Sequence, residues 1–347
     1  MSLRVAVVGA TGMVGRILLA TLQARRFPVG ALLPFSSGRS DASVRFRGRL
    51  LRAPAPASKL LRSADLVFMV SSDEVSLRYG RRLAAAGVWV IDDSSAFRMA
   101  PDVPLVIPEV NASSLSARSR LIAGPNCTLT GLAVAGYPLH SRAGIREVRL
   151  ASYQAVSGAG RESLLELYSQ LRRCSRALRP EEPLPALPRL ASRALPRPIA
   201  FNVFPQVGSF DENGDCAEER KVRAELRKIW RAPALKVSAT AVRVPTLRGH
   251  SLAVWLKTAR RLAPAAAKKL LSRAAGVHLW PEGSYPTPLS AAGTAPVHVA
   301  RVRSSGIGEE LALWIVSDNL LKGAALNSVQ IAEHLLKKGW LRKRSCP

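Results

Sequence analysis

A glycine-rich turn near the start of the chain, Gly9-Ala-Thr-Gly-Met-Val-Gly15, constrains the fold more than any other feature. It follows a short apolar run at residues 3–8 and precedes a helical pattern at residues 14–22, after which a second apolar run begins at residue 29. A strand, a tight turn, a helix and a second strand form a βαβ unit with a right-handed crossover. The sequence therefore predicts a parallel sheet at the N-terminal end of the chain.

Apolar runs continue to alternate with helical patterns over about the first 125 residues. The further strand candidates are residues 66–70, 88–91 and 121–123, and a helical pattern covers residues 75–86. This alternation predicts an α/β domain with a doubly wound parallel sheet. We expect it to occupy residues 1–127 and to be completed by a C-terminal helix within residues 324–347.

The remaining part of the chain, residues 128–323, has a different texture. Its β candidates are residues 148–156, 239–244, 253–256 and 297–302. They predict a second, α+β domain with a largely antiparallel sheet. Residues 172–198 are rich in Arg and Pro, so we expect an extended surface excursion without regular structure there.

The glycine spacing also predicts a nucleotide site. In a dinucleotide-binding turn, Gly9 would allow the tight bend, Gly12 the close approach of a pyrophosphate, and Gly15 the packing of helix on strand. At the end of the second strand, a carboxylate for a ribose hydroxyl would be usual, yet residues 35–40 read Phe-Ser-Ser-Gly-Arg-Ser. Because hydroxyls and a guanidinium suit a 2′-phosphate, the predicted cofactor is NADP.

A cysteine stands where an apolar run ends and an apolar helix begins. Cys127 follows Gly124-Pro-Asn126 and precedes the helical pattern of residues 129–139. The N-terminus of a helix favours a thiolate, and the adjacent Asn126 side chain could donate to an oxyanion. An inert, buried cysteine beside a helix cap is the commoner occupant of such a position. Taken alone, the local pattern therefore favours the inert interpretation, and the reactive one needs further support.

Composition limits the classes of function. The 347 residues are 48% hydrophobic, which suffices for two domains, and we find no apolar run long enough to cross a bilayer. Four scattered cysteines and five histidines form no disulfide framework and no metal-ligand spacing, so we expect a metal-free protein of the reducing cytoplasm. The net charge of +27 would attract polyanions, but without a nucleic-acid-binding motif we expect only non-specific adhesion to nucleic acid.

Taken together, the motifs resemble the aspartate-semialdehyde dehydrogenase family over nearly the whole chain, from residue 3 to about residue 335. The matching segments, in order, are Gly9–Gly15, Ile91–Met99, Pro108–Asn111, Gly124–Cys127, Tyr153–Gly160, Phe201–Gln206, Arg243–Ser251 and Asp318–Ala325. The resemblance implies a Rossmann-type dinucleotide-binding domain followed by a catalytic and dimerisation domain. This agrees with the α/β and α+β regions expected from the residues.

The resemblance implies a role for each matching residue. Cys127 would be the nucleophile, His250 the general acid/base, and Gln154 the group that orients substrate and thioester. A histidine with a pKa near neutrality suits acid/base work. The residues implied to bind the substrate are Arg98, Asn126, Glu218, Lys221 and Arg243. Arg243 would hold the α-carboxylate and Glu218 the amino group, while the other three would hold the phosphate. Without the resemblance, Glu218 and Lys221 have the spacing of an ordinary surface ion pair on a helix.

The implied cofactor residues extend beyond the glycine turn into the second domain. They are Gly9, Thr11, Gly12, Met13, Val14, Gly15, Ser37, Arg39, Ser40, Ser157, Gly158 and Asn319. The implied activity is the reversible, NADPH-dependent reductive dephosphorylation of L-aspartyl 4-phosphate to L-aspartate 4-semialdehyde through a cysteine thioester. It belongs to the biosynthesis of lysine, threonine, methionine and isoleucine, and the implied assembly is a homodimer or homotetramer.

Two alternatives remain open. An N-acetyl-γ-glutamyl-phosphate reductase would share the fold and the thioester chemistry, but Pro-Gly-Cys is expected there in place of Pro125-Asn-Cys127. A catalytically inactive paralogue acting as a basic binding protein would be expected to have lost a residue such as Cys127 or His250, and both are present. The chain also departs from the family's pattern at Asp93, where Asn is usual, and at Leu252, where Glu is common.

Overall fold

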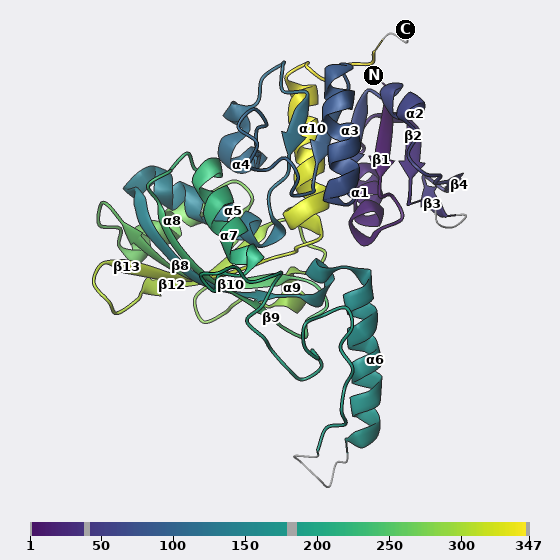
Figure 1. Cartoon of the computed structure of the whole chain (residues 1–347). Helices are drawn as coiled ribbons and strands as arrows, with labels where there is room; N and C mark the ends of the chain where they lie inside the picture. Colours follow the sequence, from purple (N-terminus) through teal and green to yellow (C-terminus); the bar gives the residue numbers. More distant parts are fainter. Residues whose placement is uncertain (1, 38–41, 179–185, 345–347) are drawn as a thin grey trace.

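The computed structural model describes residues 2–37, 42–178 and 186–344 and contains two main sheets (Figure 1). The first has five parallel strands in the order β2-β1-β5-β6-β7. Their bounds are β1 Leu3–Val8, β2 Val29–Phe35, β5 Leu66–Met69, β6 Trp89–Asp92 and β7 Leu121–Ala123. The predicted parallel sheet and its five strands are confirmed.

Helices cover both faces of this first sheet. The sheet's helices are α1 Met13–Ala24, α2 Ser58–Arg62, α3 Asp73–Ala85, α4 Pro108–Asn111 and α10 Leu326–Lys337. Because successive strand residues point to opposite faces, Val5 and Val7 pack with α1 and α10, whereas Ala6 and Val8 pack with α3. The C-terminal helix thus returns to the N-terminal sheet, as the purple and yellow segments of Figure 1 show.

The second sheet has six strands in the order β11-β12-β13-β10-β8-β9. Their bounds are β8 Ile145–Gln154, β9 Lys236–Arg243, β10 His250–Thr258, β11 Val277–Leu279, β12 Val297–Ser304 and β13 Glu310–Ser317. The three central pairings are antiparallel, and the outer pairings β8–β9 and β11–β12 are parallel. The sheet is therefore mixed, with the predicted antiparallel pairing at its centre.

Helices cover one face of the second sheet. Helices α5 Cys127–Ala143, α7 Ala217–Ile229 and α8 Pro264–Leu271 pack on the side to which Leu252 and Val254 of β10 point. Helix α6, Arg161–Ala177, projects away from both sheets (Figure 1). The expectation that residues 172–198 lack regular structure was therefore wrong for residues 172–177, because apolar side chains at helical spacing, including buried Leu167 and Cys174, continue α6 to Ala177.

Strands β11 and β13 and helices α2, α4 and α8 were not predicted from the sequence. Nor were several smaller elements, namely the hairpin β3 Ser43–Phe46 and β4 Arg49–Arg52, helix α9 Pro288–Ala291, two 3₁₀ turns at Ala112–Ser114 and Val156–Ala159, and a π-helical turn at Leu321–Ala325. None of the helices in the described residues is long and apolar enough to cross a membrane.

Candidate active site

The predicted nucleophile begins a helix that starts where the last strand of the first sheet ends. Cys127 is the first residue of α5, and Asn126 caps the helix by accepting hydrogen bonds from the backbone N–H groups of Thr128 (2.8 Å) and Leu129 (3.3 Å). The Asn126 amide nitrogen donates to a Glu218 oxygen at 2.9 Å. The amide oxygen therefore serves the cap and one N–H serves Glu218, which leaves the second N–H of the amide for a ligand beside the nucleophile.

The predicted acid/base residue lies against the nucleophile. His250 is the first residue of β10, is only 1% exposed, and has its Nε2 atom 3.5 Å from Cys127 Sγ. The backbone N–H of Ala155 donates to His250 Nδ1 at 3.0 Å, which turns Nε2 toward the sulfur. Cys127 itself retains partial exposure. The thiol is thus reachable and paired with an imidazole within proton-transfer reach.

Two expectations about charge at this pair were wrong. Burial and the nearby Glu218 carboxylate raise the pKa of Cys127 to about 11, and this outweighs the opposing effect of Arg98 and Arg243. Burial, together with the Arg243 guanidinium, lowers the pKa of His250 to about 3, well below neutrality. The resting pair is therefore a neutral thiol beside a neutral imidazole, because desolvation overrides the helix N-terminus.

Two further predicted residues meet at the ends of adjacent strands. Gln154 ends β8 and Arg243 ends β9, and the two residues are paired in register. The Arg243 guanidinium donates to the Ala155 carbonyl oxygen at 2.8 Å, while its buried Nε atom has no partner among the described residues. An unsatisfied N–H on a buried cation makes Arg243 a suitable group for binding an anion.

Glu218 is buried in α7 and does not behave as a surface charge. Its carboxylate accepts hydrogen bonds from Thr128 Oγ1 (2.7 Å), Gln154 Nε2 (3.2 Å) and the Asn126 amide. The interpretation of Glu218 and Lys221 as an exposed ion pair was therefore wrong, because α7 turns Glu218 toward α5. A carboxylate in this position can accept from an amino group.

Arg98 is also held inside the site. One of its terminal nitrogens donates to the Asp93 carbonyl oxygen at 2.8 Å and the other to Glu225 Oε1 at 3.1 Å. Its Nε atom is buried and has no partner among the described residues. Glu225 and Asp93, which also shape this site, had not been predicted as functional residues from the sequence.

A cavity of about 470 Å³ gathers most of the predicted residues. The predicted residues that line it are Val14, Arg98, Asn126, Cys127, Gln154, Ser157, Gly158, Glu218, Lys221, Arg243 and Asn319. His250 lies behind the lining, against Cys127. Ser71 also lines the cavity and has a buried hydroxyl without a partner among the described residues, which suits a bound polar group.

The glycine turn lies next to this cavity, and its backbone geometry requires glycine. Gly9 has φ +87°, and a Cβ there would lie 2.3 Å from the Val70 carbonyl oxygen. A Cβ on Gly15 would lie 2.2 Å from the Gly9 carbonyl oxygen. The turn leads directly into α1, whose first residues are Met13 and Val14, so it has the form of a dinucleotide-binding turn.

The remaining predicted cofactor residues are not in the cavity lining. Apart from Val14, the residues of the turn, Gly9, Thr11, Gly12, Met13 and Gly15, do not line it, and neither does Ser37 just beyond β2. Arg39 and Ser40, on which the expectation of NADP partly rests, lie outside the described residues.

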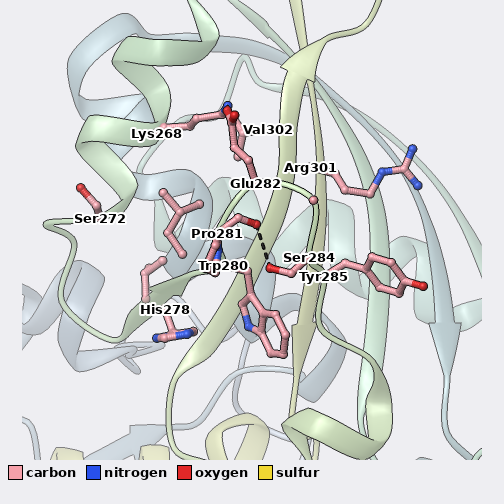
Figure 2. Close-up of a pocket in the computed structure, with 13 residues that line it drawn as sticks. Lys268, Ser272, His278, Trp280, Pro281, Glu282, Ser284, Tyr285, Arg301 and Val302 are labelled. Atoms are coloured by element: carbon pink, nitrogen blue, oxygen red, sulfur yellow. Dashed lines mark hydrogen bonds and ion pairs between the residues drawn. The ribbon is translucent and has the colours of Figure 1, made fainter.

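A larger cavity, of about 780 Å³, lies at the β11–β12 edge of the second sheet (Figure 2). It is lined by aromatic and mixed polar side chains, among them Trp280, Tyr285, Lys268 and Arg301. The Ser284 hydroxyl donates to the Pro281 carbonyl oxygen at 2.8 Å across the turn that borders it (Figure 2). No predicted site residue and no cysteine lines this cavity, so the smaller one is the candidate active site.

The geometry of the fold and the site defines a class of protein. A dinucleotide-binding turn in a parallel α/β domain lies next to a cavity whose thiol–imidazole pair forms where that domain meets the second one, as in a dehydrogenase that works through a cysteine. Residues 4–118 match the family described as semialdehyde dehydrogenase, NAD binding domain. Residues 137–322 match the family described as semialdehyde dehydrogenase, dimerisation domain.

Individual proteins that are similar to this chain over nearly its full length are aspartate-semialdehyde dehydrogenases. Aspartate-semialdehyde dehydrogenase of a Synechocystis strain is 39% identical over 344 residues, covering 98% of this chain and 99% of the relative. That of Bacillus subtilis is 40% identical, covering 96% and 98%. The crystal structure of aspartate semialdehyde dehydrogenase II from Vibrio cholerae superposes with a TM-score of 0.91 at 35% identity, covering 97% and 99%. The chain therefore belongs to the aspartate-semialdehyde dehydrogenase family.

Proposed function

We propose that the protein catalyses the reversible, NADP-dependent conversion of L-aspartyl 4-phosphate to L-aspartate 4-semialdehyde through a thioester on Cys127. The observation that carries this proposal is the 3.5 Å contact between Cys127 Sγ and His250 Nε2 at the wall of a cavity rich in anion-binding groups. One solved relative is described as aspartate semialdehyde dehydrogenase II from Vibrio cholerae complexed with ASA, at 34% identity and a TM-score of 0.91.

The acyl chemistry takes place on the chain's own sulfur. Cys127 Sγ attacks the acyl carbon of the aspartyl phosphate, and phosphate leaves as the thioester forms. Because Nδ1 of the neutral His250 ring accepts from Ala155, the ring proton lies on Nε2, and the thiol proton leaves to water in the cavity. His250 Nε2–H then donates to the attacking sulfur and, after hydride transfer, to the substrate oxygen. Gln154, hydrogen-bonded to Glu218, orients the bound acyl group. NADP, when bound, supplies or accepts the hydride.

The polar groups of the cavity divide according to the charges of the substrate. We assign the α-carboxylate to Arg243 and the amino group to the Glu218 carboxylate. We assign binding of the phosphate to Arg98, Asn126 and Lys221. Arg98 and Arg243 each retain a buried, unpartnered Nε–H, which supports their role as anion-binding groups.

We assign the cofactor to the glycine turn and the adjoining wall of the cavity. Residues 9–15 would hold the pyrophosphate, while Ser157, Gly158 and Asn319 would lie along the nicotinamide half. Ser157 and Asn319 are hydrogen-bonded to each other, and Asn319 Oδ1 also accepts from the Gly249 N–H at 2.8 Å, just before His250. We further propose that Ser37, Arg39 and Ser40 recognise the 2′-phosphate of NADP.

We propose a domain division at residues 127 and 128, with the C-terminal helix completing the first domain. The family match of the second domain supports a dimer, and we propose a homodimer in the cytoplasm, where the thiol would stay reduced. The pathway would be the biosynthesis of lysine, threonine, methionine and isoleucine.

A coupled assay tests the activity. Purified protein supplied with aspartate semialdehyde, phosphate and NADP should reduce NADP, and omission of phosphate should stop sustained turnover. N-acetylglutamate semialdehyde should not replace the substrate. If it does so with equal efficiency, the protein is a reductase of the N-acetyl-γ-glutamyl phosphate type. Absence of turnover with either aldehyde would favour the inactive binding protein.

A further inference from the structure

Helix α7, which packs on the second sheet, is hydrogen-bonded to a loop of the first domain. Its Glu225 carboxylate accepts from Arg98 at 3.1 Å and, through its other oxygen, from the backbone N–H of Asn126 at 2.7 Å. Three residues further along the same helix, Lys228 Nζ donates to the carbonyl oxygens of Arg98 (2.7 Å), Ala100 (2.7 Å) and Val103 (2.9 Å). One helix therefore fixes both the guanidinium and the backbone of the loop at residues 98–103.

The contacts of Glu225 are those of a fully used, buried carboxylate. The residue is only 1% exposed, and each of its two oxygens accepts from a different segment of the first domain. A buried charge held by two donors at fixed positions orients both of them, because losing either bond leaves an unpaired polar group away from water. Here the two donors are Arg98 and Asn126, both assigned to the phosphate.

We propose that Glu225 and Lys228 are positioning residues that present Arg98 and Asn126 to the phosphate of the substrate. Neither residue lines the cavity, so both act through the groups they hold. This inference rests on the proposed function, since it takes phosphate as the ligand of Arg98 and Asn126. Phosphate affinity would then depend on α7, the helix that packs on the second sheet and contacts the first domain.

The same helix supplies a matched control. Glu219 is also buried and also accepts from two N–H donors, those of Cys216 (2.7 Å) and Ala241 (2.8 Å). Neither donor lies in the cavity lining. Glu219→Gln therefore removes the same charge from the same helix, with a comparable loss of hydrogen bonding, but from donors that do not line the cavity.

The test compares Michaelis constants of Glu225→Gln, Lys228→Gln and Glu219→Gln in the full-length protein. A glutamine at 225 has one accepting oxygen and places its NH₂ against the second donor, so it cannot hold Arg98 and Asn126 together. We expect Glu225→Gln to raise the KM for phosphate by about tenfold or more. Its KM for aspartate semialdehyde should stay within about twofold of wild type, and its kcat within about threefold.

Lys228 holds only backbone carbonyl oxygens of the loop, so its loss acts on Arg98 less directly. We expect Lys228→Gln to raise the KM for phosphate by roughly threefold to tenfold. Glu219→Gln should leave both Michaelis constants within about twofold, even if its Tm falls. Unchanged phosphate KM in both test variants would overturn the inference, as would equal rises for both substrates. Loss of folding in both test variants with a soluble Glu219→Gln would also overturn it, because the pair would then serve stability alone. A wild-type protein without phosphate-dependent turnover would instead contradict the proposed function.

Discussion

Cys127 and His250 meet in surroundings that oppose charge on either side chain. Their 3.5 Å contact lies among buried groups, with Ala155 fixing the ring. The nearby carboxylate of Glu218 raises the pKa of the thiol further. The resting nucleophile is therefore a neutral thiol that faces the Nε2–H of a neutral imidazole, and it is not stored as a thiolate–imidazolium pair.

The rate at which the resting enzyme is alkylated reports the protonation state of the Cys127 thiol. Since the pKa of Cys127 is about 11, its thiolate fraction should grow about tenfold per pH unit across the range from 6 to 9. The rate of iodoacetamide modification at Cys127, followed by peptide mass spectrometry, should rise in parallel. A rate that is already constant below pH 7 would instead indicate a stored ion pair.

Asp93 is a second residue whose charge is opposed by its surroundings. Its Oδ1 accepts from the Ser328 hydroxyl at 2.5 Å, and its buried Oδ2 has no partner among the described residues. Burial and the neighbouring Asp92 raise the pKa of Asp93 from 3.8 to about 7, against the opposite effects of Ser328 and Arg98. The family's usual Asn would carry no such charge.

Asp93→Asn should therefore stabilise the protein in a pH-dependent way. Because the folded-state pKa lies above the unfolded one, the stability that Asp93 contributes is present below about pH 4 and is lost as pH rises through about 7. The variant should exceed wild type by on the order of 2–4 kcal/mol at pH 8, with the gap narrowing toward pH 5. Denaturant unfolding at several pH values measures this gap, and a pH-independent gap would contradict the assignment.

The π-helical turn Leu321–Ala325 packs directly against α5 and lines part of the active-site cavity. Its wide hydrogen bonds run from Gly323 N–H to the Asp318 oxygen (2.9 Å) and from Ala325 N–H to the Leu320 oxygen (3.2 Å). Lys322 anchors the turn through a buried ion pair with Glu109 at 2.7 Å. The turn brings the Gly323 backbone against the nucleophile, where a Cβ would lie 2.9 Å from Cys127 Cβ.

Gly323→Ala should consequently displace Cys127 without unfolding the protein. The added methyl meets the Cβ and the backbone of Cys127, so α5 or the turn must shift by several tenths of an ångström. We expect kcat to fall by about tenfold to a hundredfold, because small misplacements of reacting groups are costly. Steady-state kinetics with a parallel Tm measurement would detect this, and wild-type kcat would show that the close contact has no catalytic consequence.

Local signals in the sequence were sufficient for the elements that carry them. The glycine turn requires backbone that only glycine adopts there, and the apolar runs around it predicted β1 and α1 to within a residue or two. The β3–β4 hairpin was missed although Arg47 (φ +49°) and Gly48 (φ +79°) form its turn. An Arg-Gly pair is a weaker hairpin signal than Asn-Gly.

Long-range contacts could not be predicted in this way. Charged side chains such as Glu225 and Lys322 are expected at solvated positions. Contacts with distant segments bury them instead, through Arg98 and Asn126 for Glu225 and through Glu109 for Lys322. The pKa values of Cys127 and His250 were misjudged for the same reason, because desolvation depends on the whole surroundings and not on the helix start. The identities of the reacting residues, in contrast, followed from their motifs.

In the described part of the chain, α5, α7 and α8 cover one face of the second sheet, and no comparable helical layer covers the other face. Ala253 of β10 is paired in register with Ala151 of β8 and Trp314 of β13, and all three point away from α5 and remain partly exposed. The ring of Tyr153, which is 38% exposed, lies tilted by 51° beside that of Trp314, with 5.8 Å between the ring centroids. A partly apolar face of this kind suits the dimer interface proposed above.

Ala253→Arg should therefore abolish the dimer. A guanidinium in the middle of this face would be buried without a partner on association. Size-exclusion chromatography with light scattering should give the dimer mass for wild type and the monomer mass for the variant. Ala265→Arg, an exposed change on α8, should remain dimeric. A dimeric Ala253→Arg would place the interface elsewhere.

The most direct test of the thioester is a single turnover without phosphate. Enzyme mixed with aspartate semialdehyde and NADP should release about one NADPH per subunit and then stop, because no phosphate is present to cleave the acyl group. Mass spectrometry should find an aspartyl group on the peptide containing Cys127, and Cys127→Ala should show neither the burst nor the adduct. A burst that survives Cys127→Ala, or an acyl group on another residue, would contradict thioester chemistry at this cysteine.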